Sequence, residues 1–278
     1  MRATMLALVM ASMFPFGCDR TPKEDPADAQ AKLQSDLKAA AAFTRNNKPK
    51  DAEKLYADIL AKQPDEPQAL AGLARLRLSA DKVDEALSMV DKSIAGAGED
   101  AAVHSLRGEI LAKKGDHAEA AAAFGKAFTL APEKSEYGLP YGVQLKLAKK
   151  YDDAEKVLRQ VAELDPMAQF VYTELGDVMR AQDRLDDALK TYMKALSMWA
   201  SDKMAHAGAA QVYEAKGDIR HALDEWSTYV RMDCCSPYSV DVAKKRILAL
   251  QAASNGEDGG GGAGPEGTPP AQPGTSGA

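Results

Sequence analysis

The chain has 278 residues, which is long enough for one or two domains with a buried core. It contains 51 Ala, and aromatic residues make up only 6% of it. This composition favours closely packed helices and excludes a β-sandwich or barrel, whose strands need β-branched and aromatic residues. The formal net charge of -6 provides no positive field for nucleic acid, so we expect no nucleic-acid partner.

Residues 1–17 have the features of an export signal. A positive charge at Arg2 is followed by a mostly apolar stretch, residues 3–16, and by the small residue Gly17. The stretch is too short to cross a bilayer as a helix, which needs about 20 apolar residues. Because a cysteine follows Gly17 directly, the segment resembles a bacterial lipoprotein signal.

This resemblance implies that Cys18 is lipidated and becomes the mature N-terminus, so that the lipid holds the chain at a membrane. The charged, proline-containing residues 18–32 are then expected to form a tether. We therefore expect a lipid-anchored protein of the bacterial cell envelope whose remaining residues lie in the periplasm, on either the inner or the outer membrane. The alternative is an ordinary secretory signal cut nearby, with Cys18 as an unmodified thiol.

A pattern with a spacing of 34 residues fills the centre of the chain. Alanine occupies one column of the pattern, at Ala52, Ala86, Ala120, Ala154, Ala188 and Ala222. Twelve residues before each alanine lies a second small residue: Ala40, Ala74, Gly108, Gly142, Gly176 and Ala210. Four residues after each alanine lies a large apolar residue: Tyr56, Val90, Phe124, Leu158, Tyr192 and Trp226. Small and large residues at this spacing allow two helices to approach closely, so each unit is predicted to be a helical hairpin.

Turn residues separate the two helices of a predicted unit and close the unit. In Gly115-Asp116 and Gly217-Asp218, the glycine can take the left-handed C′ position and the aspartate can cap the next helix. Three units end in a proline, which cannot continue a helix: Pro64, Pro132 and Pro166.

These columns make the chain similar to the tetratricopeptide repeat family, whose 34-residue units carry small residues at positions 8 and 20 and a large residue at position 24. The resemblance implies an all-α fold, a right-handed solenoid of six hairpins at residues 33–66, 67–100, 101–134, 135–168, 169–202 and 203–236. Residues 237–253 are expected to form a helix that caps the last apolar face. Residues 254–278 hold nine Gly and four Pro in 25 residues, so this tail is predicted to be disordered.

Motifs that carry catalysis do not appear in the sequence, which has no HExxH, no phosphate-binding glycine loop and no GxSxG. We therefore predict no enzyme activity, no cofactor, no metal site and no small-molecule substrate. His104 and His206 occupy the same position of two units and are expected to pack against a neighbouring helix. Cys234 and Cys235 either form a strained disulfide or join a partner, or are a small apolar filler beside an incidental thiol.

The resemblance also implies a binding surface, because the first helices of successive tetratricopeptide units line a concave groove. The expected partner-binding residues are Arg75, Glu109, Lys113, Lys146, Phe170, Asp177, Arg180, Gln211 and Glu214, with Met204 as a further apolar contact. Their charges have both signs, so a uniformly acidic or basic ligand is not favoured, and each charge could equally lie on a solvated helix face.

Two residues depart from the repeat pattern. Pro140 predicts that the first helix of its unit starts late or kinks, which widens the groove locally. Trp199 is either an exposed binding anchor or a residue that packs on the next hairpin.

The function expected from these features is that of a non-catalytic adaptor or scaffold of the cell envelope, which binds a partner protein or an extended peptide in its groove. A more specific alternative is an assembly factor for a pilus or an outer-membrane complex, because six repeats on a lipid anchor resemble the layout of type IV pilus pilotins. A third alternative is a regulatory or recruiting subunit for an envelope hydrolase.

Overall fold

A computed structural model describes residues 25–97 and 99–258 of the chain. The predicted signal peptide, Cys18 and most of the predicted tail lie outside the described residues. Within the described ranges the chain is all-α: every regular element is a helix and there is no strand.

The helices follow one another as pairs joined by short turns. The pairs are α1 (Pro26–Arg45) with α2 (Pro49–Lys62), α3 (Pro67–Ser79) with α4 (Val83–Ala97), α5 (Ala101–Lys114) with α6 (His117–Leu130), α7 (Ser135–Leu147) with α8 (Tyr151–Leu164), α9 (Val171–Ala181) with α10 (Leu185–Met198), and α11 (Lys203–Ala215) with α12 (Ile219–Met232). A short π-helical turn, η1 (Ser239–Ala243), then leads into α13 (Lys244–Asp258).

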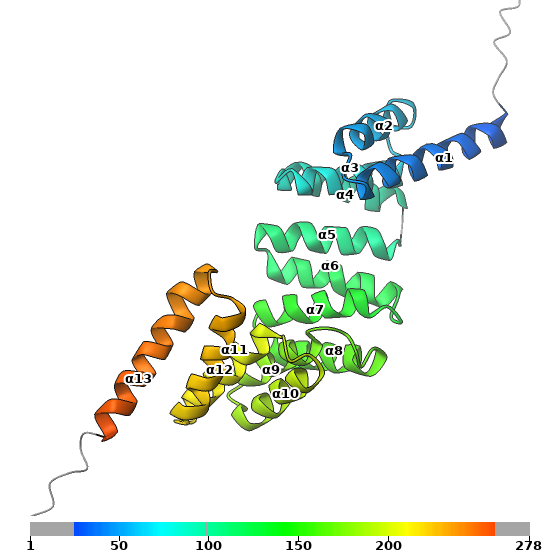
Figure 1. The fold of residues 1–278 in the computed structure, drawn as a ribbon. Coiled ribbons are helices and arrows are strands. Elements are labelled where there is room, and N and C mark those ends of the chain that lie inside the picture. Colours follow the sequence, from blue (N-terminus) through cyan, green and yellow to red (C-terminus); the bar gives the residue numbers. More distant parts are fainter. Residues whose placement is uncertain (1–24, 98, 259–278) are drawn as a thin grey trace, which may run out of the picture.

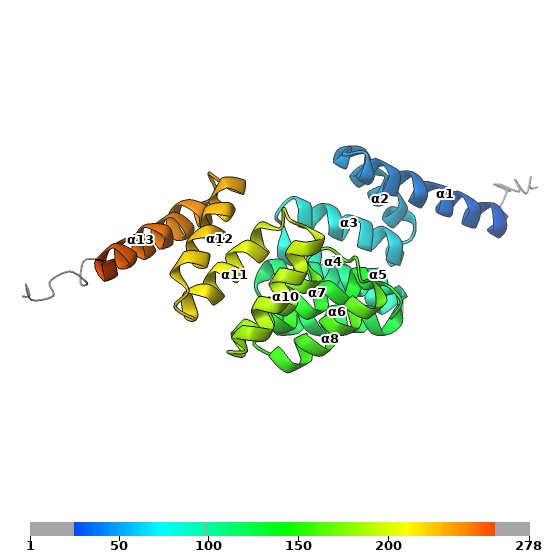
Figure 2. The ribbon, with the colours of Figure 1, turned by 60° about the horizontal axis from the view of Figure 1, so that its bottom comes forward.

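The hairpins stack in chain order, with α1 and α2 at one end of the array and α12 and α13 at the other (Figure 1). In both views α13 extends away from the stacked helices, and it contacts α12 and η1 (Figure 2). Each hairpin therefore packs mainly on its sequence neighbours, which is the organisation of a solenoid.

The turn inside each hairpin has the same backbone geometry. A residue with positive φ recurs at every 34th position, at Asn47, Asp81, Gly115, Lys149, Asp183 and Gly217, with φ between 53° and 89°. The left-handed conformation expected for Gly115 and Gly217 is confirmed. The expected aspartate caps are confirmed at one of the two turns: Asp218 accepts a hydrogen bond from the His221 backbone N–H at 3.2 Å, whereas Asp116 makes no such bond.

The three residue columns meet in the interior of each hairpin. All six alanines of the first column are completely buried, and the six large residues are buried against them. In three hairpins the large side chain lies over a glycine of the first helix: Phe124 over Gly108, Leu158 over Gly142 and Tyr192 over Gly176. A Cβ on Gly108 would come within 2.7 Å of Cδ2 of Phe124, so the two helices lie as close as they do because that position lacks a side chain.

Two helices extend beyond the ranges expected from composition. Helix α1 begins at Pro26, inside the predicted tether, because Pro26 is preorganised for a first turn and Asp25 accepts a hydrogen bond from the Ala27 N–H at 3.0 Å. Helix α13 continues past residue 253 to Asp258, into the predicted tail. The remaining repeat boundaries stay predictions.

Pro140 does not delay its helix, so the expected late start is wrong. Helix α7 begins at Ser135, and Pro140 lies in its second turn. The helix that begins late is α9, because Phe170 just before it takes a left-handed conformation with φ of 69°.

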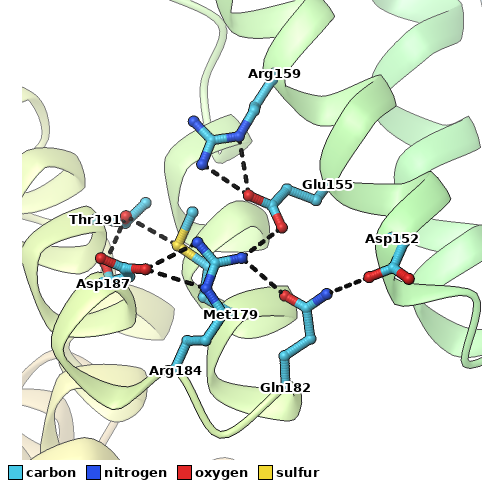
Figure 3. Close-up of polar contacts among 8 residues, drawn as sticks. All are labelled: Asp152, Glu155, Arg159, Met179, Gln182, Arg184, Asp187 and Thr191. Atoms are coloured by element: carbon cyan, nitrogen blue, oxygen red, sulfur yellow. Dashed lines mark hydrogen bonds and ion pairs between the residues drawn. The ribbon is translucent and has the colours of Figure 1, made fainter.

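Polar side chains tie successive hairpins together along the edge formed by their turns. The contacts use the same two repeat positions in three places: Lys114 with Asp84, Gln182 with Asp152, and Lys216 with Asp186. Figure 3 shows the second of these contacts within a larger cluster, in which Arg184 contacts Glu155 and Asp187 at 2.7 and 2.8 Å. The cluster therefore links α8 to the turn between α9 and α10.

Candidate functional site

The first helices of the hairpins form one layer of the array. Helix α1 contacts α3, α3 contacts α5, α7 contacts α9, and α9 contacts α11. All the expected partner-binding residues lie on this layer: Arg75 on α3, Glu109 and Lys113 on α5, Lys146 on α7, Phe170 next to α9, Asp177 and Arg180 on α9, and Gln211 and Glu214 on α11. Their roles in binding stay predictions, but their environments differ sharply.

In the middle of the array, the expected contact residues are engaged with one another. The Lys146 ammonium lies 2.5 Å from Glu174 and 2.8 Å from Asp177, so α7 is bound to α9 by one cation shared between two carboxylates. Burial opposes the charge of Lys146, but both carboxylates outweigh it and raise the pKa of this side chain. Burial also raises the pKa of Glu174, against the attraction of Lys146 and with repulsion from Asp177. This ion cluster therefore couples two hairpins.

The same cluster continues into the second helix of its hairpin. Tyr192 donates a hydrogen bond to Asp177 at 2.6 Å, and Arg180 donates one to the Tyr192 oxygen at 3.3 Å. Burial and the neighbouring Asp177 raise the pKa of Tyr192, so its hydroxyl remains protonated and can donate. Both carboxylate oxygens of Asp177 are thus engaged within the fold, and Arg180 is held beside them at 3.5 Å.

At the C-terminal end, the expected contact residues bind the chain's own last helices. Gln211 donates a hydrogen bond to the Tyr238 hydroxyl at 3.0 Å. Glu214 accepts a hydrogen bond from the Trp226 indole and pairs with Arg246 of α13 at 3.3 Å. These contacts dock η1 and α13 onto the last hairpin, so they act inside the protein.

The remaining expected residues are more accessible. Lys113 pairs with Asp81 at 2.8 Å, whereas Glu109 is exposed and has no ion-pair partner among the described residues. Phe170 and Met204 are 43% and 45% exposed and occupy the same position of successive hairpins. They leave an apolar edge at the start of α9 and α11.

A groove of about 420 Å³ lies at the N-terminal end of the layer, between α1, α3 and α5. Small and apolar residues make up most of its lining, including Ala41, Ala71, Val103 and Leu106. The Tyr56 ring belongs to the lining and reaches it over Gly72, where a Cβ would overlap the ring. The groove is mostly apolar with a few polar groups, which is typical of ligand sites.

Two arginines enter this lining from different hairpins. Arg45 lies in the last turn of α1 and Arg75 lies on α3, and both are exposed. Neither has an ion-pair partner within 4.0 Å among the described residues, in contrast to Lys146 and Arg180. The groove therefore offers uncompensated positive charge beside an apolar floor.

Sequence reasoning found Arg75 in this groove and missed the rest. Arg45 has the same position in the first unit as Lys113 has in the third, which is a groove-facing position, so the repeat pattern itself could have found it, whereas Gly72 stands outside the repeat columns. The recurrence of glycine at Gly72 and Gly208, at the same position of two units, is the signal that could have indicated space over Tyr56 and Tyr192.

The other residues that the sequence singled out have packing environments. His104 is half-buried, and burial lowers its pKa. His206 is half-buried between Glu225 and the Ala200 carbonyl. Trp199 is half-buried against the core that includes α9 and α10, so its packing alternative is the one observed.

Cys234 and Cys235 are free and exposed, so they form no disulfide with each other, and Cys234 does not fill space in the core. In the described part of the chain, no group of three or more His, Cys, Asp or Glu is arranged to hold a metal ion. None of the described helices combines the length and apolar character needed to cross a bilayer.

Sequence and structure comparisons agree with this architecture. Models of the tetratricopeptide repeat family match residues 43–110, 101–134 and 146–203. The structure is similar to PilF of Pseudomonas aeruginosa, with a TM-score of 0.65 and 17% identity over 81% of this chain and 98% of PilF. A tetratricopeptide repeat protein from Parabacteroides merdae gives a TM-score of 0.67 with 15% identity, over 81% of this chain and 89% of that one.

YrrB, described as a TPR protein with an unusual peptide-binding site, gives a TM-score of 0.55 with 18% identity, over 68% of this chain and 97% of YrrB. No curated protein matches the sequence. The chain belongs to the tetratricopeptide repeat family, and the solved structures show that it shares their fold.

Proposed function

We propose that this protein is a non-catalytic adaptor that binds an extended segment of a partner protein in the groove between α1, α3 and α5. The observation that carries this proposal is the contrast along the first-helix layer. At Lys146 and Asp177 the layer is closed by ion pairs, whereas at Ala71 and Arg75 it holds an open groove of about 420 Å³. An open apolar groove with a few polar groups is a typical ligand site.

The peptide-binding site named for YrrB, which shares this fold, supports a peptide as the bound species. Stacked hairpins also keep the first-helix layer fixed, because each hairpin is held by contacts with its neighbours. A preformed groove lowers the ordering cost of binding, so an extended segment can bind without rearrangement of the helices.

Selection of peptides from a random displayed library tests this proposal. Peptides recovered on the wild-type protein should lose binding to Ala71→Trp, in which an indole fills the groove. They should bind normally to Ala122→Trp, at an exposed position of α6 outside the groove. Thermal melts of both variants check that the fold is retained. Equal binding to both variants would assign the peptides to another surface.

Anchoring to a membrane of the bacterial cell envelope through a lipid on Cys18 is the second part of the proposal, with the repeats in the periplasm. It is supported by the order of Arg2, the apolar residues 3–16, Gly17 and Cys18 in the sequence. Labelled palmitate should be incorporated into the wild-type protein and into Cys235→Ser, but not into Cys18→Ser. Labelling that persists in Cys18→Ser would show that Cys18 does not carry the lipid.

A second candidate function is that of a pilotin-type assembly factor for a pilus or an outer-membrane complex. The observation that favours it is the likeness in fold to PilF over 98% of that chain. Deletion of the gene in its own bacterium should then abolish surface pili or deplete an outer-membrane complex, and the wild-type gene should restore them. Normal assembly in the deletion strain would contradict the pilotin-type role and would not affect the adaptor proposal.

A further inference from the structure

We infer that the segment bound between α1, α3 and α5 is acidic, with aspartate or glutamate side chains that pair with Arg45 and Arg75. This inference rests on the proposed function, because it names the chemistry of the segment that the groove takes. The whole set of expected groove residues carries charges of both signs and predicts a ligand of mixed charge. The residues that line this groove predict an acidic ligand instead.

The charges that line the groove are mostly positive. Its lining contains two guanidinium groups, Arg45 and Arg75, and one carboxylate, Asp100. Asp100 is already used by the fold, since it caps α5 by accepting a hydrogen bond from the Ala102 N–H at 2.8 Å. The lining therefore carries net positive charge, although the protein as a whole carries a formal charge of -6.

Nearby carboxylates do not neutralise this charge. Glu53, on the other side of Arg75, pairs with Arg77 at 2.7 Å and not with Arg75. Glu109 is exposed one hairpin further on and does not line the groove. Its negative charge disfavours an acidic group over α5, so the acidic side chains of the partner belong over α1 and α3.

The two arginines also suit carboxylates by their geometry. A guanidinium presents paired N–H donors that match the two oxygens of a carboxylate, and such charge-assisted bonds are stronger than neutral ones. The apolar floor at Ala71 and Val103 takes the uncharged part of an extended chain, and lowers the solvent screening of the ion pairs above it. A free anion would gain nothing from the apolar floor. The floor and the two arginines together therefore favour an acidic peptide over a free anion.

Peptide selection on three forms of the full chain tests the inference. The forms are the wild type, the double variant Arg45→Gln/Arg75→Gln, and the control Arg220→Gln, which changes an exposed arginine of α12 outside the groove. The best wild-type peptide is then compared by fluorescence anisotropy with its amide version, in which each Asp and Glu is replaced by Asn and Gln. Both arginines of the double variant are exposed, so its thermal melt should match that of the wild type.

The inference predicts that wild-type peptides are rich in Asp and Glu and that amide replacement weakens binding by about tenfold or more. The double variant should bind the acidic peptide more weakly by the same factor and should bind the amide version nearly as well as the wild type does. Arg220→Gln should bind both peptides as the wild type does.

Three results would overturn it. Peptides that bind wild type and the double variant equally would remove the acidic specificity while leaving the proposed function intact. Self-association of the wild type that the double variant abolishes would assign the groove to a second copy of the chain. Recovery of no peptide on wild type would remove the inference and the peptide-binding function together.

Discussion

The hydroxyl of Tyr192 donates a 2.6 Å hydrogen bond to Oδ1 of Asp177. Tyr192 lies on α10 and is completely buried, whereas Asp177 lies on α9, which belongs to the first-helix layer. The ring fits between two glycines, Gly176 and Gly208, where a Cβ would overlap it. The Tyr192 side chain therefore fills its own hairpin and packs on the next one. It also holds the Asp177 carboxylate of the first-helix layer in place.

Tyr192→Phe should lower the free energy of unfolding by about 1 kcal/mol, because it removes a hydrogen bond to a largely buried carboxylate. Urea denaturation measures the effect. Tyr151→Phe is the control, since the half-buried Tyr151 makes no side-chain hydrogen bond in the described part of the chain. Equal stability of the two variants would contradict the role given to the Tyr192 hydroxyl.

Ala120→Leu should overpack the third hairpin and lower the free energy of unfolding by about 1–3 kcal/mol. Ala120 is completely buried beneath the large residues of its hairpin, so the longer side chain has no space. Ala122→Leu, two residues away on the exposed face of α6, should leave thermal stability nearly unchanged. A stable Ala120→Leu variant would show that the repeat columns are placed in the wrong register.

Lys146→Met should destabilise the array, because Glu174 then loses its cation and faces Asp177, which retains only the longer contact with Arg180 at 3.5 Å. Removal of one partner from a fully buried pair costs about 3–5 kcal/mol, and the partial exposure of this cluster reduces the expected loss to about 1–3 kcal/mol. Lys190→Met, at an exposed position of α10 without an ion pair in the described residues, should be neutral. Unchanged stability of Lys146→Met would favour a role in ligand contact over one in coupling α7 to α9.

The sixth hairpin contains a pH-dependent contact. Nδ1 of His206 lies 2.5 Å from a carboxylate oxygen of Glu225, and Nε2 lies 3.1 Å from the Ala200 carbonyl oxygen. The hydrogen bond to Glu225 raises the pKa of His206 against the opposing effect of burial, with further support from the Ala200 carbonyl and from Asp202. The protonated imidazole thus stabilises the fold below the pKa of the unfolded chain, and this stabilisation is lost as pH rises through the raised pKa of the folded state.

His206→Gln should therefore cost more stability at about pH 5.5 than at about pH 8.5. Parallel urea titrations of wild type and variant at the two pH values measure the difference, which cancels contributions from the other histidines. Glu225→Gln should reduce the pH dependence in the same way, since it removes the acceptor. A His206→Gln effect that is constant between the two pH values would show that the contact does not involve the protonated ring.

Periodicity predicted the fold because the spacing of small and large residues directly encodes how two helices pack. The same reasoning could not predict which groove residues are free. Lys146 and Arg180 have the same sequence signature as Arg75, namely a cation at a groove-facing position. Their neutralisation depends on Glu174 and Asp177, whose distances from the two cations are set by the tertiary arrangement of the hairpins.

Local rules also failed where tertiary packing decided the outcome. Pro140 suggested a late helix start, but α7 begins at Ser135 and contains Pro140 in its second turn. The delayed helix is α9, where Phe170 has a left-handed backbone that no glycine signals. Composition placed the start of α1 too late, since the cap at Asp25 and the proline at Pro26 lie in a segment that reads as a charged tether.

The central claim is that the groove between α1, α3 and α5 receives an extended segment of a partner. Methyl resonances of the full chain, recorded with and without a selected peptide, test it most directly. The account predicts that shifts concentrate on Ala41, Ala71 and Val103, while Ala122 on the opposite helix of its hairpin remains unchanged. Shifts centred on α9 and α11, or distributed over the second helices, would contradict it.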